Sequence, residues 1–524
     1  MAAGLAEALG LPKTDWLPIL ILVSACVVSL YYTRLNKNAR LPPGPRGIPF
    51  LGNILQVPTK QHWLRFAEMG EVWGDICSLT VLGQTMVIVN SHKVAQDLLD
   101  ARGSNFSDRP IIPVGGELAG FNNALPLVQH GDRMRKERKL FHRLFGTHAS
   151  VRQFVPLIST EVHKLLRNIL LNPDRLVDEI TRATGAITIR IAYGYHLRDG
   201  PDRDPLLEMF ETGGNNFFIS STPAAFLADI IPIFRFWPEW FPGGGFHTTA
   251  KAWSKQFQAT IDTGLQYVKN EMAAGKAEPS FVSTILEEKS HDDYLIKWAA
   301  AAIQIGGSDT TASQLEAFFL AMMLYPAVQA TAQREIDRVV GQDRLPDIND
   351  RAQLPYIDAL CKEVVRWHVA VPLAVPHRAR EDYIYERGGG MEPLLIPKDS
   401  LIIPNLWKMA HDPERYFNPM EFDPSRFLAN WEGDGKEAEP DPADICFGYG
   451  RRICPGRLLG ETAIFLECSA VLSVFNISMA RGADGAAIEP QLGQTSATVS
   501  HVLPFKCVVQ PRNARALALI QSSS

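Results

Sequence analysis

Residues 447–456 (FGYGRRICPG) combine a cysteine, a fixed positive charge and several glycines in one short loop. Cys454 precedes Pro455, which suits the first turn of a helix, and the donors and dipole of a helix N-terminus favour a thiolate. Arg452 is suited to bind a carboxylate. Three glycines permit tight or left-handed turns and a close approach of a flat cofactor: Gly448, Gly450 and Gly456. The pattern predicts a cysteine that binds a metal or a haem iron, whereas an isolated cysteine is more often an inert core residue.

A second polar group, Asp309 followed by Thr310, interrupts an apolar stretch at residues 298–324 that has the length of a long buried helix. An acid and a hydroxyl are costly there unless they are paired or used in chemistry, and this pair can transfer protons. Gly306 and Gly307 weaken the helix just before them by about 1 kcal/mol each. A helix kink with a satisfied polar pair is the alternative interpretation.

Glu363 and Arg366 share one face of a predicted amphipathic helix at residues 354–369, where their spacing lets them pair. By itself such a pair is typical of a protein surface. Arg138 and His377, taken alone, are typical of solvated side chains. Each of these features gains meaning only in combination with the cysteine loop.

Together, and in this order, the motifs resemble those of the cytochrome P450 family. The haem-ligand pattern F-x-x-G-x-R-x-C-x-G is matched at Phe447, Gly450, Arg452, Cys454 and Gly456. The resemblance implies that Cys454 is the axial ligand of haem b, to whose iron a thiolate donates electron density that favours O–O cleavage. It also implies that O2 is a substrate and that Asp309 and Thr310 relay protons to it.

The family's E-x-x-R motif and its later P-x-R-F motif correspond to Glu363, Arg366 and Arg426. The resemblance implies that these three side chains form a buried ionic cluster behind the ligand loop. Such a cluster has a structural role, because removing one member leaves a buried charge without its partner.

The resemblance also implies that Arg138, His377 and Arg452 bind the haem propionates. One position departs from the family pattern. Met134 stands where a tryptophan is expected in W-x-x-x-R, which removes one N–H donor. This departure affects the expected details of propionate binding and leaves the prediction of haem unchanged.

The substrate pocket is expected between irregular apolar segments at residues 110–128 and 217–246, the helix before Asp309, residues 372–375 and the turn near Thr498. Candidate groups that orient the substrate are Asn122, Asn123, Ser220, Ser221 and Thr222. The largely apolar walls predict a lipophilic small molecule, for which a terpenoid, a polyketide-like or an aromatic compound would be suitable.

The elements that must position these residues are mainly helical. Hydrophobic periodicity predicts a mainly α protein with small β-sheets, and the resemblance specifies the cytochrome P450 fold. Helices are expected at residues 155–171, 298–324 and 354–369. Strands are expected at residues 86–89, 401–404 and, around Pro504, 501–509.

Residues 16–32 form an uncharged run that as a helix would be roughly 26 Å long, which is sufficient for a single transmembrane anchor. Residues 1–15 would then be lumenal, residues 33–49 a basic and proline-rich hinge, and residues 50–524 a cytosolic haem-thiolate monooxygenase domain at the endoplasmic reticulum membrane. The alternative is a cleaved signal peptide. It is disfavoured because no small-residue cleavage site follows and most of the positive charge comes after the run.

Composition narrows the classes of partner. A net charge of -5, from 52 basic and 57 acidic residues, gives no general attraction to nucleic acid. Seven cysteines without a CxxC pair argue against a disulfide framework or a structural zinc site. No nucleotide-binding glycine loop is evident, so electrons must come from a partner. The resemblance identifies this partner as NADPH-cytochrome P450 reductase, which Arg451 and Arg457 could contact.

The expected function is that of a monooxygenase that inserts one oxygen atom from O2 into a lipophilic molecule, by hydroxylation or multistep oxidation. The sequences of the motifs are most similar to those of fungal members that oxidise secondary metabolites. Two alternatives retain the haem: an isomerase or dehydratase that needs no reductase, and a membrane protein that binds haem without catalysis. The intact Asp309–Thr310 pair argues against the first, and Met134 is the motif departure that favours the second.

Overall fold

The computed structural model describes residues 41–198, 203–221, 226–289, 291–387, 390–433 and 435–522. The predicted lumenal segment at 1–15, the predicted anchor at 16–32 and residues 33–40 of the predicted hinge lie outside these residues. Within the described part, no single helix is both long and apolar enough to cross a membrane. The pair α13 (Asp293–Leu324) and α14 (Pro326–Val339) passes on length and composition together, but the two helices are bent by 105°.

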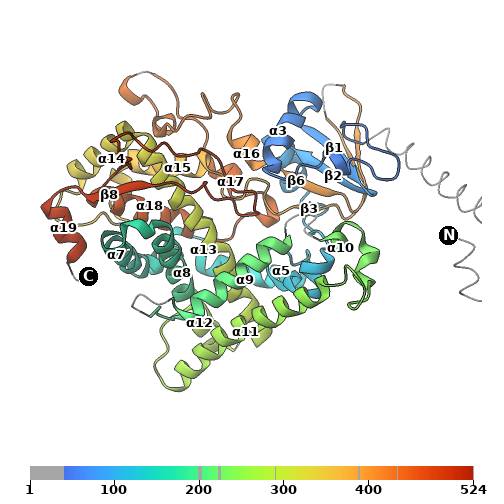
Figure 1. Cartoon of the computed structure of the whole chain (residues 1–524), viewed down its shortest axis with the longest axis horizontal. Coiled ribbons are helices and arrows are strands. Elements are labelled where there is room, and N and C mark those ends of the chain that lie inside the picture. Colours follow the sequence, from blue (N-terminus) through green and yellow to red (C-terminus); the bar gives the residue numbers. More distant parts are fainter. Residues whose placement is uncertain are drawn as a thin grey trace, which may run out of the picture.

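A body of helices surrounds α13, which runs through the middle of the molecule (Figure 1). Ala299, Ala300 and Ala301 in its first half are fully buried, whereas Asp309 and Thr310 near its middle are partly exposed. The other helices of the body are α5 (Asp132–Phe145), α6 (His148–Val151), α7 (Val155–Leu171), α8 (Leu176–Tyr193), α9 (Pro205–Ser221), α10 (Leu227–Ile230), α11 (Phe246–Ala273), α12 (Phe281–Glu288), α15 (Pro355–Trp367), α18 (Arg457–Val474) and α19 (Ala514–Gln521).

Two adjacent glycines, Gly306 and Gly307, affect the packing of α13. At Gly307 an added Cβ would lie 2.8 Å from Cγ2 of Thr188 on α8, so the missing side chain allows these two helices to pack closely. At Gly306 an added Cβ would meet nothing within 4 Å, because this position borders open space. The helix ends at Leu324, and Pro326 begins the next one, which suits the first turn of a helix.

A four-stranded sheet lies beside the helical body, with the order β1 (Ile76–Val81), β2 (Gln84–Val89), β6 (Leu401–Pro404) and β3 (His377–Arg378). Strand β6 runs parallel to β2, with Met86 opposite Leu401, so it joins two distant parts of the chain. Short helices flank the sheet: α3 (His62–Trp73), α4 (His92–Ala95), α16 (Leu406–Ala410) and α17 (Ala443–Cys446). Two antiparallel pairs of strands complete the fold: β4 (Tyr383–Tyr385) with β5 (Leu394–Ile396), and β7 (Phe475–Met479) with β8 (Cys507–Pro511).

The predicted mainly α class with small sheets is confirmed, as are the helix at 155–171 and the strand at 401–404. The strand predicted at 501–509 is wrong over residues 501–506, because β8 begins only at Cys507. Pro504 has no N–H to donate to a ladder. The backbone N–H of His501 instead binds Oγ1 of Thr495, at 2.9 Å.

Candidate active site

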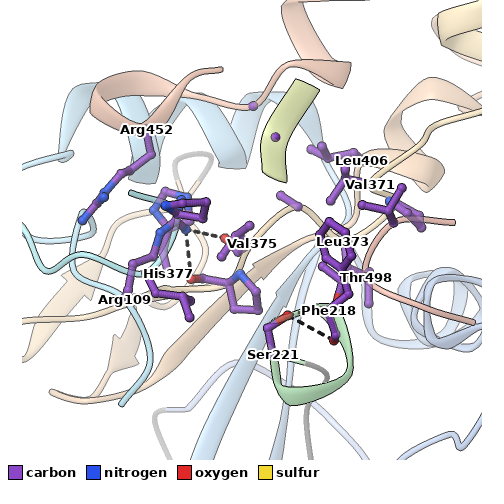
Figure 2. Close-up of a pocket in the computed structure, with 18 of the residues that line it drawn as sticks. Arg109, Phe218, Ser221, Val371, Leu373, Val375, His377, Leu406, Arg452 and Thr498 are labelled. Atoms are coloured by element: carbon purple, nitrogen blue, oxygen red, sulfur yellow. Dashed lines mark hydrogen bonds between the residues drawn. The ribbon is translucent and has the colours of Figure 1, made fainter. Parts of the chain in front are cut away.

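A cavity of about 1430 Å³ lies between the sheet and the helical body. Its walls include the segments that the sequence predicted: Pro110–Pro113 and Leu125–Leu127 from the first irregular segment, Phe217 and Phe218 from the second, residues 372–375, and Thr498. In Figure 2, Val371, Leu373, Leu406 and Thr498 lie on one side of this pocket, while Arg109, His377 and Arg452 gather on the other. The cavity therefore has an apolar part and a basic part.

The cysteine loop forms one wall between α17 and α18. Gly448 and Gly450 have positive φ angles of 76° and 54°, which favour glycine. At Gly450 a Cβ would also lie 2.1 Å from the carbonyl oxygen of Leu99, so no side chain fits there. Gly456 has a negative φ of -95° and therefore needs no left-handed backbone. These turns bring the backbone N–H of Cys454 to the carbonyl oxygen of Phe447, at 2.8 Å.

Cys454 exposes its side chain, and the surface that it exposes faces the cavity. The side of the sulfur away from the cavity is packed against protein atoms, and the resulting loss of hydration raises the pKa of the thiol, outweighing the opposing effects of the Gly456 N–H and the Arg138 charge. The Gly456 N–H thus acts in the direction expected at a helix start, although its effect on the pKa is smaller than that of burial. Helix α18 begins only at Arg457, so the sulfur lies outside its first turn. A bound metal cation would favour the deprotonated sulfur, because a coordinating thiol loses its proton.

Four basic side chains converge at the other end of the loop, and we call them the basic cluster: Arg109, Arg138, His377 and Arg452. Arg138 donates to the carbonyl oxygen of Ile453 at 2.9 Å, and Arg452 donates to that of Ser107 at 2.9 Å. Arg109 donates to two carbonyl oxygens of the segment just before β3, those of Val375 and Pro376.

Burial lowers the pKa of all four groups, and the charges of neighbouring arginines add to this effect for Arg109, His377 and Arg452. For Arg452 the pKa falls to about 10. Moreover, Nε of Arg109 is buried without a hydrogen-bond partner. Like charges packed together, with a donor left over, are suited to a bound anion with more than one carboxylate. The propionates of haem meet this requirement, so the residues present fit the cofactor.

The sequence identified three members of the basic cluster and missed Arg109. A lone arginine before Pro110 carries no pattern that distinguishes it from a surface charge. Met134, which replaces the expected tryptophan, is buried in the main hydrophobic core and offers no N–H donor. Arg109 supplies donors near the same group of side chains, so the basic cluster does not depend on an indole at position 134.

The structure separates the two residues of the predicted proton relay. Thr310 lines the cavity, and its hydroxyl donates to the carbonyl oxygen of Gly306 at 2.7 Å. Asp309 faces another way: its Oδ1 lies 3.2 Å from Nε2 of His501, and its side chain is 34% exposed. The carboxyl group therefore lies between solvent and the C-terminal segment of the chain, while the hydroxyl lies in the pocket.

The three residues of the predicted ionic cluster, Glu363, Arg366 and Arg426, contact one another. Arg366 binds both carboxylate oxygens of Glu363, at 2.7 and 2.8 Å, and Arg426 binds the same carboxylate at 3.2 Å. The side chains of Glu363 and Arg366 are fully buried. Arg366 also donates to the carbonyl oxygens of Ala410 and Pro419, which anchors the loops that precede the cysteine.

The candidate orienting groups divide into two sets. Ser221 lines the cavity, 3.4 Å from Oγ1 of Thr498. Ser220 instead donates to the carbonyl oxygen of Phe217, and Asn123 accepts from Arg133. Asn122 is not among the residues that line the cavity, and Thr222 lies outside the described residues.

The comparisons with known proteins agree with this site. Residues 42–504 match the family model described as Cytochrome P450. The chain is 42% identical over 502 residues to Cytochrome P450 monooxygenase 208 of Postia placenta. This alignment covers 95% of this chain and 96% of that protein. It is 42% identical to Cytochrome P450 monooxygenase claR of Ampulloclitocybe clavipes, over 95% of this chain and 91% of that protein. It is 36% identical to Cytochrome P450 monooxygenase ppsD of Aspergillus oryzae, over 96% and 95%. The chain thus belongs to the cytochrome P450 family and is a monooxygenase of that family.

Proposed function

We propose that this monooxygenase inserts one oxygen atom from O2 into a lipophilic secondary metabolite, and that Cys454 is the thiolate ligand of its haem. The observation that carries the proposal is the arrangement of one cavity. Its wall includes the cysteine, its basic part fits two propionates, and Thr310 and apolar side chains line the remainder. The similarity to monooxygenases over most of the chain favours oxygen insertion over the isomerase or dehydratase and the non-catalytic alternatives.

The protein's contribution is to bind, orient and deliver protons. When bound, haem supplies the redox chemistry that reduces and cleaves dioxygen. The basic cluster would hold the propionates, and the Phe447–Cys454 backbone bond would fix the direction of the sulfur. The Thr310 hydroxyl would serve as a proton donor on the substrate side of α13. The apolar walls would keep bulk water from the reacting carbon and orient the substrate by shape, with Ser221 as a polar contact.

Electrons are proposed to come from NADPH through a membrane-bound cytochrome P450 reductase. Arg451 is an exposed residue of the ligand loop, so its charge is available at the surface, where its guanidinium contacts His130. Arg457 is bound to Glu461 at 2.8 Å and is therefore less suited to a docking role. The described part supports Arg451 as the better candidate of the two for contact with an acidic partner.

Membrane association at the endoplasmic reticulum is proposed through the anchor at residues 16–32. Large apolar side chains are exposed in two segments that both contribute lining residues to the cavity: Phe50, Leu51 and Leu55 near the start of the described chain, and Phe236, Trp240 and Phe241 after α10. Exposed apolar patches of this kind are typical of a membrane-contact face. A lipophilic substrate could then enter directly from the bilayer.

The test begins with the reduced full-length protein in the presence of carbon monoxide. We expect the strongly red-shifted Soret band of a thiolate-bound haem, and its loss in Cys454→Ser. Cys446→Ser is the matched control, because this nearby cysteine also lines the cavity and should leave the band in place. Product formation with NADPH and reductase, measured against candidate terpenoid, polyketide and aromatic scaffolds, then identifies the substrate. Turnover that needs no reductase would contradict the proposal.

The basic cluster has its own readout. Arg109→Met removes a buried guanidinium that has a free donor, so we expect a lower ratio of haem to protein and faster haem loss to an acceptor protein. Arg135→Met, an exposed arginine paired with Asp132 on α5, serves as the control. Unchanged haem retention in Arg109→Met would remove this residue from the site.

A further inference from the structure

His501 joins two carboxylates on one face of α13. Its Nε2 lies 3.2 Å from Asp309, and its Nδ1 lies 3.1 and 3.2 Å from the two oxygens of Glu316. These acids are seven residues apart, which places them two turns apart on the same helix face. A neutral imidazole carries a single N–H, so only the protonated ring can donate to both carboxylates. We call this arrangement the acid bridge.

The electrostatics agree with that geometry. Burial opposes protonation of His501, but the hydrogen bonds and charges of Asp309 and Glu316 outweigh it and raise the pKa of His501 to about 10. Two other titratable groups face this region. Burial raises the pKa of Glu211 on α9, and the Asp309 charge adds to the shift. Burial lowers the pKa of His368 to about 4, so this ring stays neutral.

The two acids differ in their surroundings. Glu316 is buried, with its side chain 6% exposed, whereas the side chain of Asp309 reaches solvent. Glu316 can therefore keep His501 charged even when Asp309 takes up a proton or turns away. Without Glu316, protonation of Asp309 would leave a partly buried cation without a counter-ion, which is costly.

The residues before His501 form part of the cavity wall. Ser496, Thr498 and Val499 line the cavity, and Ser500 is fixed behind them. Its backbone N–H donates to the carbonyl oxygen of Ala370 at 2.7 Å, and its own carbonyl oxygen accepts from Ser313 on α13 at 2.6 Å. One short segment thus contacts both the space for the substrate and the acid that precedes Thr310.

We propose that His501 is a positioning residue for proton delivery: it holds the Asp309 carboxylate at the solvent side of α13 and ties its position to the substrate-contacting turn at 496–499. This inference rests on the proposed function. In that reaction, O2, two electrons from NADPH and two protons yield one oxygen atom in the product and one molecule of water. Asp309 takes a proton from solvent, passes it toward Thr310, and returns as a carboxylate to His501.

The central test is His501→Gln in the full-length enzyme with reductase. The amide is neutral and cannot hold both acids, so we expect product per NADPH to fall roughly three- to tenfold while hydrogen peroxide rises. The solvent isotope effect on product formation should increase, because proton delivery becomes slower. The carbon monoxide spectrum and the substrate-induced spectral shift should not change. His501→Arg keeps a cation that can reach both carboxylates and should restore most of the coupling.

Two further variants keep the inference falsifiable. His196→Gln is the matched control, since this histidine is paired with Glu278 at 2.7 Å on another surface, and it should behave like the wild type. Glu316→Gln weakens the hold on the His501 proton, so coupling should fall as the pH rises from 6.5 to 8.5, unlike in the wild type. If His501→Gln fails to fold, this pH profile decides the matter.

The outcomes separate the inference from the proposed function. A wild-type enzyme without a thiolate-haem spectrum or NADPH-dependent product would overturn the proposed function. A functional wild type with His501→Gln equally well coupled would overturn the inference alone. Equal losses in His501→Arg and His501→Gln would also overturn it, because the role would then be one of shape rather than charge.

Discussion

Glu467 should lower the free energy of unfolding of the protein by an amount that depends on pH. It lies in α18 with a fully buried side chain, and neither carboxyl oxygen has a hydrogen-bond partner in the described structure. Burial raises the pKa of this carboxyl from 4.5 to about 8. The folded protein therefore keeps a proton at neutral pH that the unfolded chain releases. Below pH 4.5 the carboxyl is protonated in both states and its ionisation costs no stability. As the pH rises from 4.5 toward 8, only the unfolded chain releases the proton, so the free energy of unfolding falls.

The magnitude follows from this difference. Each pH unit between the two pKa values costs about 1.4 kcal/mol, so roughly 4 kcal/mol has been lost at pH 7.5. Glu467→Met has a similar length, no ionisable group and a flexible apolar side chain. We expect it to be more stable than the wild type at pH 7.5. We also expect the difference in unfolding free energy between the two proteins to shrink by about 1.4 kcal/mol per unit on acidification to pH 5.5.

Urea unfolding curves of the detergent-solubilised full chain, followed by tryptophan fluorescence at pH 5.5, 6.5 and 7.5, measure this difference. Using the difference between two proteins removes the titration of all other groups. Glu489→Gln, at an exposed position, is the control and should track the wild type at every pH. A difference between Glu467→Met and the wild type that stays constant across the two pH units would refute the reasoning, because the carboxyl would then ionise equally in both states.

Three other outcomes follow from the site and its support. Arg366→Ala removes five hydrogen bonds from a buried ion cluster and should cost about 3–5 kcal/mol in the same urea assay; a loss below about 1 kcal/mol, typical of a surface pair, would contradict burial as the cause. Thr310→Ala should leave haem binding and NADPH oxidation intact while diverting oxygen to peroxide, and unchanged product yield would exclude its hydroxyl from proton transfer. Gly450→Ala should reduce haem content more than Gly448→Ala: both have positive φ, but only at Gly450 does a Cβ meet the Leu99 carbonyl oxygen. Equal haem content in the two variants, measured by absorbance, would mean that the close contact is relieved by a backbone shift.

Much of this architecture could be predicted because local patterns specify it. Apolar periodicity located α7 to the residue, and the glycines around Cys454 indicated a tight loop before any contact was known. The Glu363–Arg366 spacing predicted a pair. Its burial came only from the family resemblance, because spacing alone is the same on a surface and in a core.

Features that depend on tertiary contacts were not predictable in the same way. Nothing near Arg109 in the sequence indicates that its side chain lies beside residues more than 250 positions away. The sequence predicts a strand that begins at His501, whereas the ring of this residue bridges two acids of α13. The direction of Asp309 away from the cavity also follows from that bridge. Adjacent residues on a helix point about 100° apart, so the motif alone does not determine whether both side chains face the pocket.

The basic cluster has a consequence for how the enzyme matures. Its members come from four separate stretches of the chain, so the cluster exists only after most of the fold has formed. Until an anion lies among them, three guanidinium groups repel one another in a poorly hydrated space. Cofactor capture would relieve that repulsion and so act as the final stabilising step of folding. Cells short of haem should accordingly accumulate less of this protein, even at an unchanged rate of synthesis.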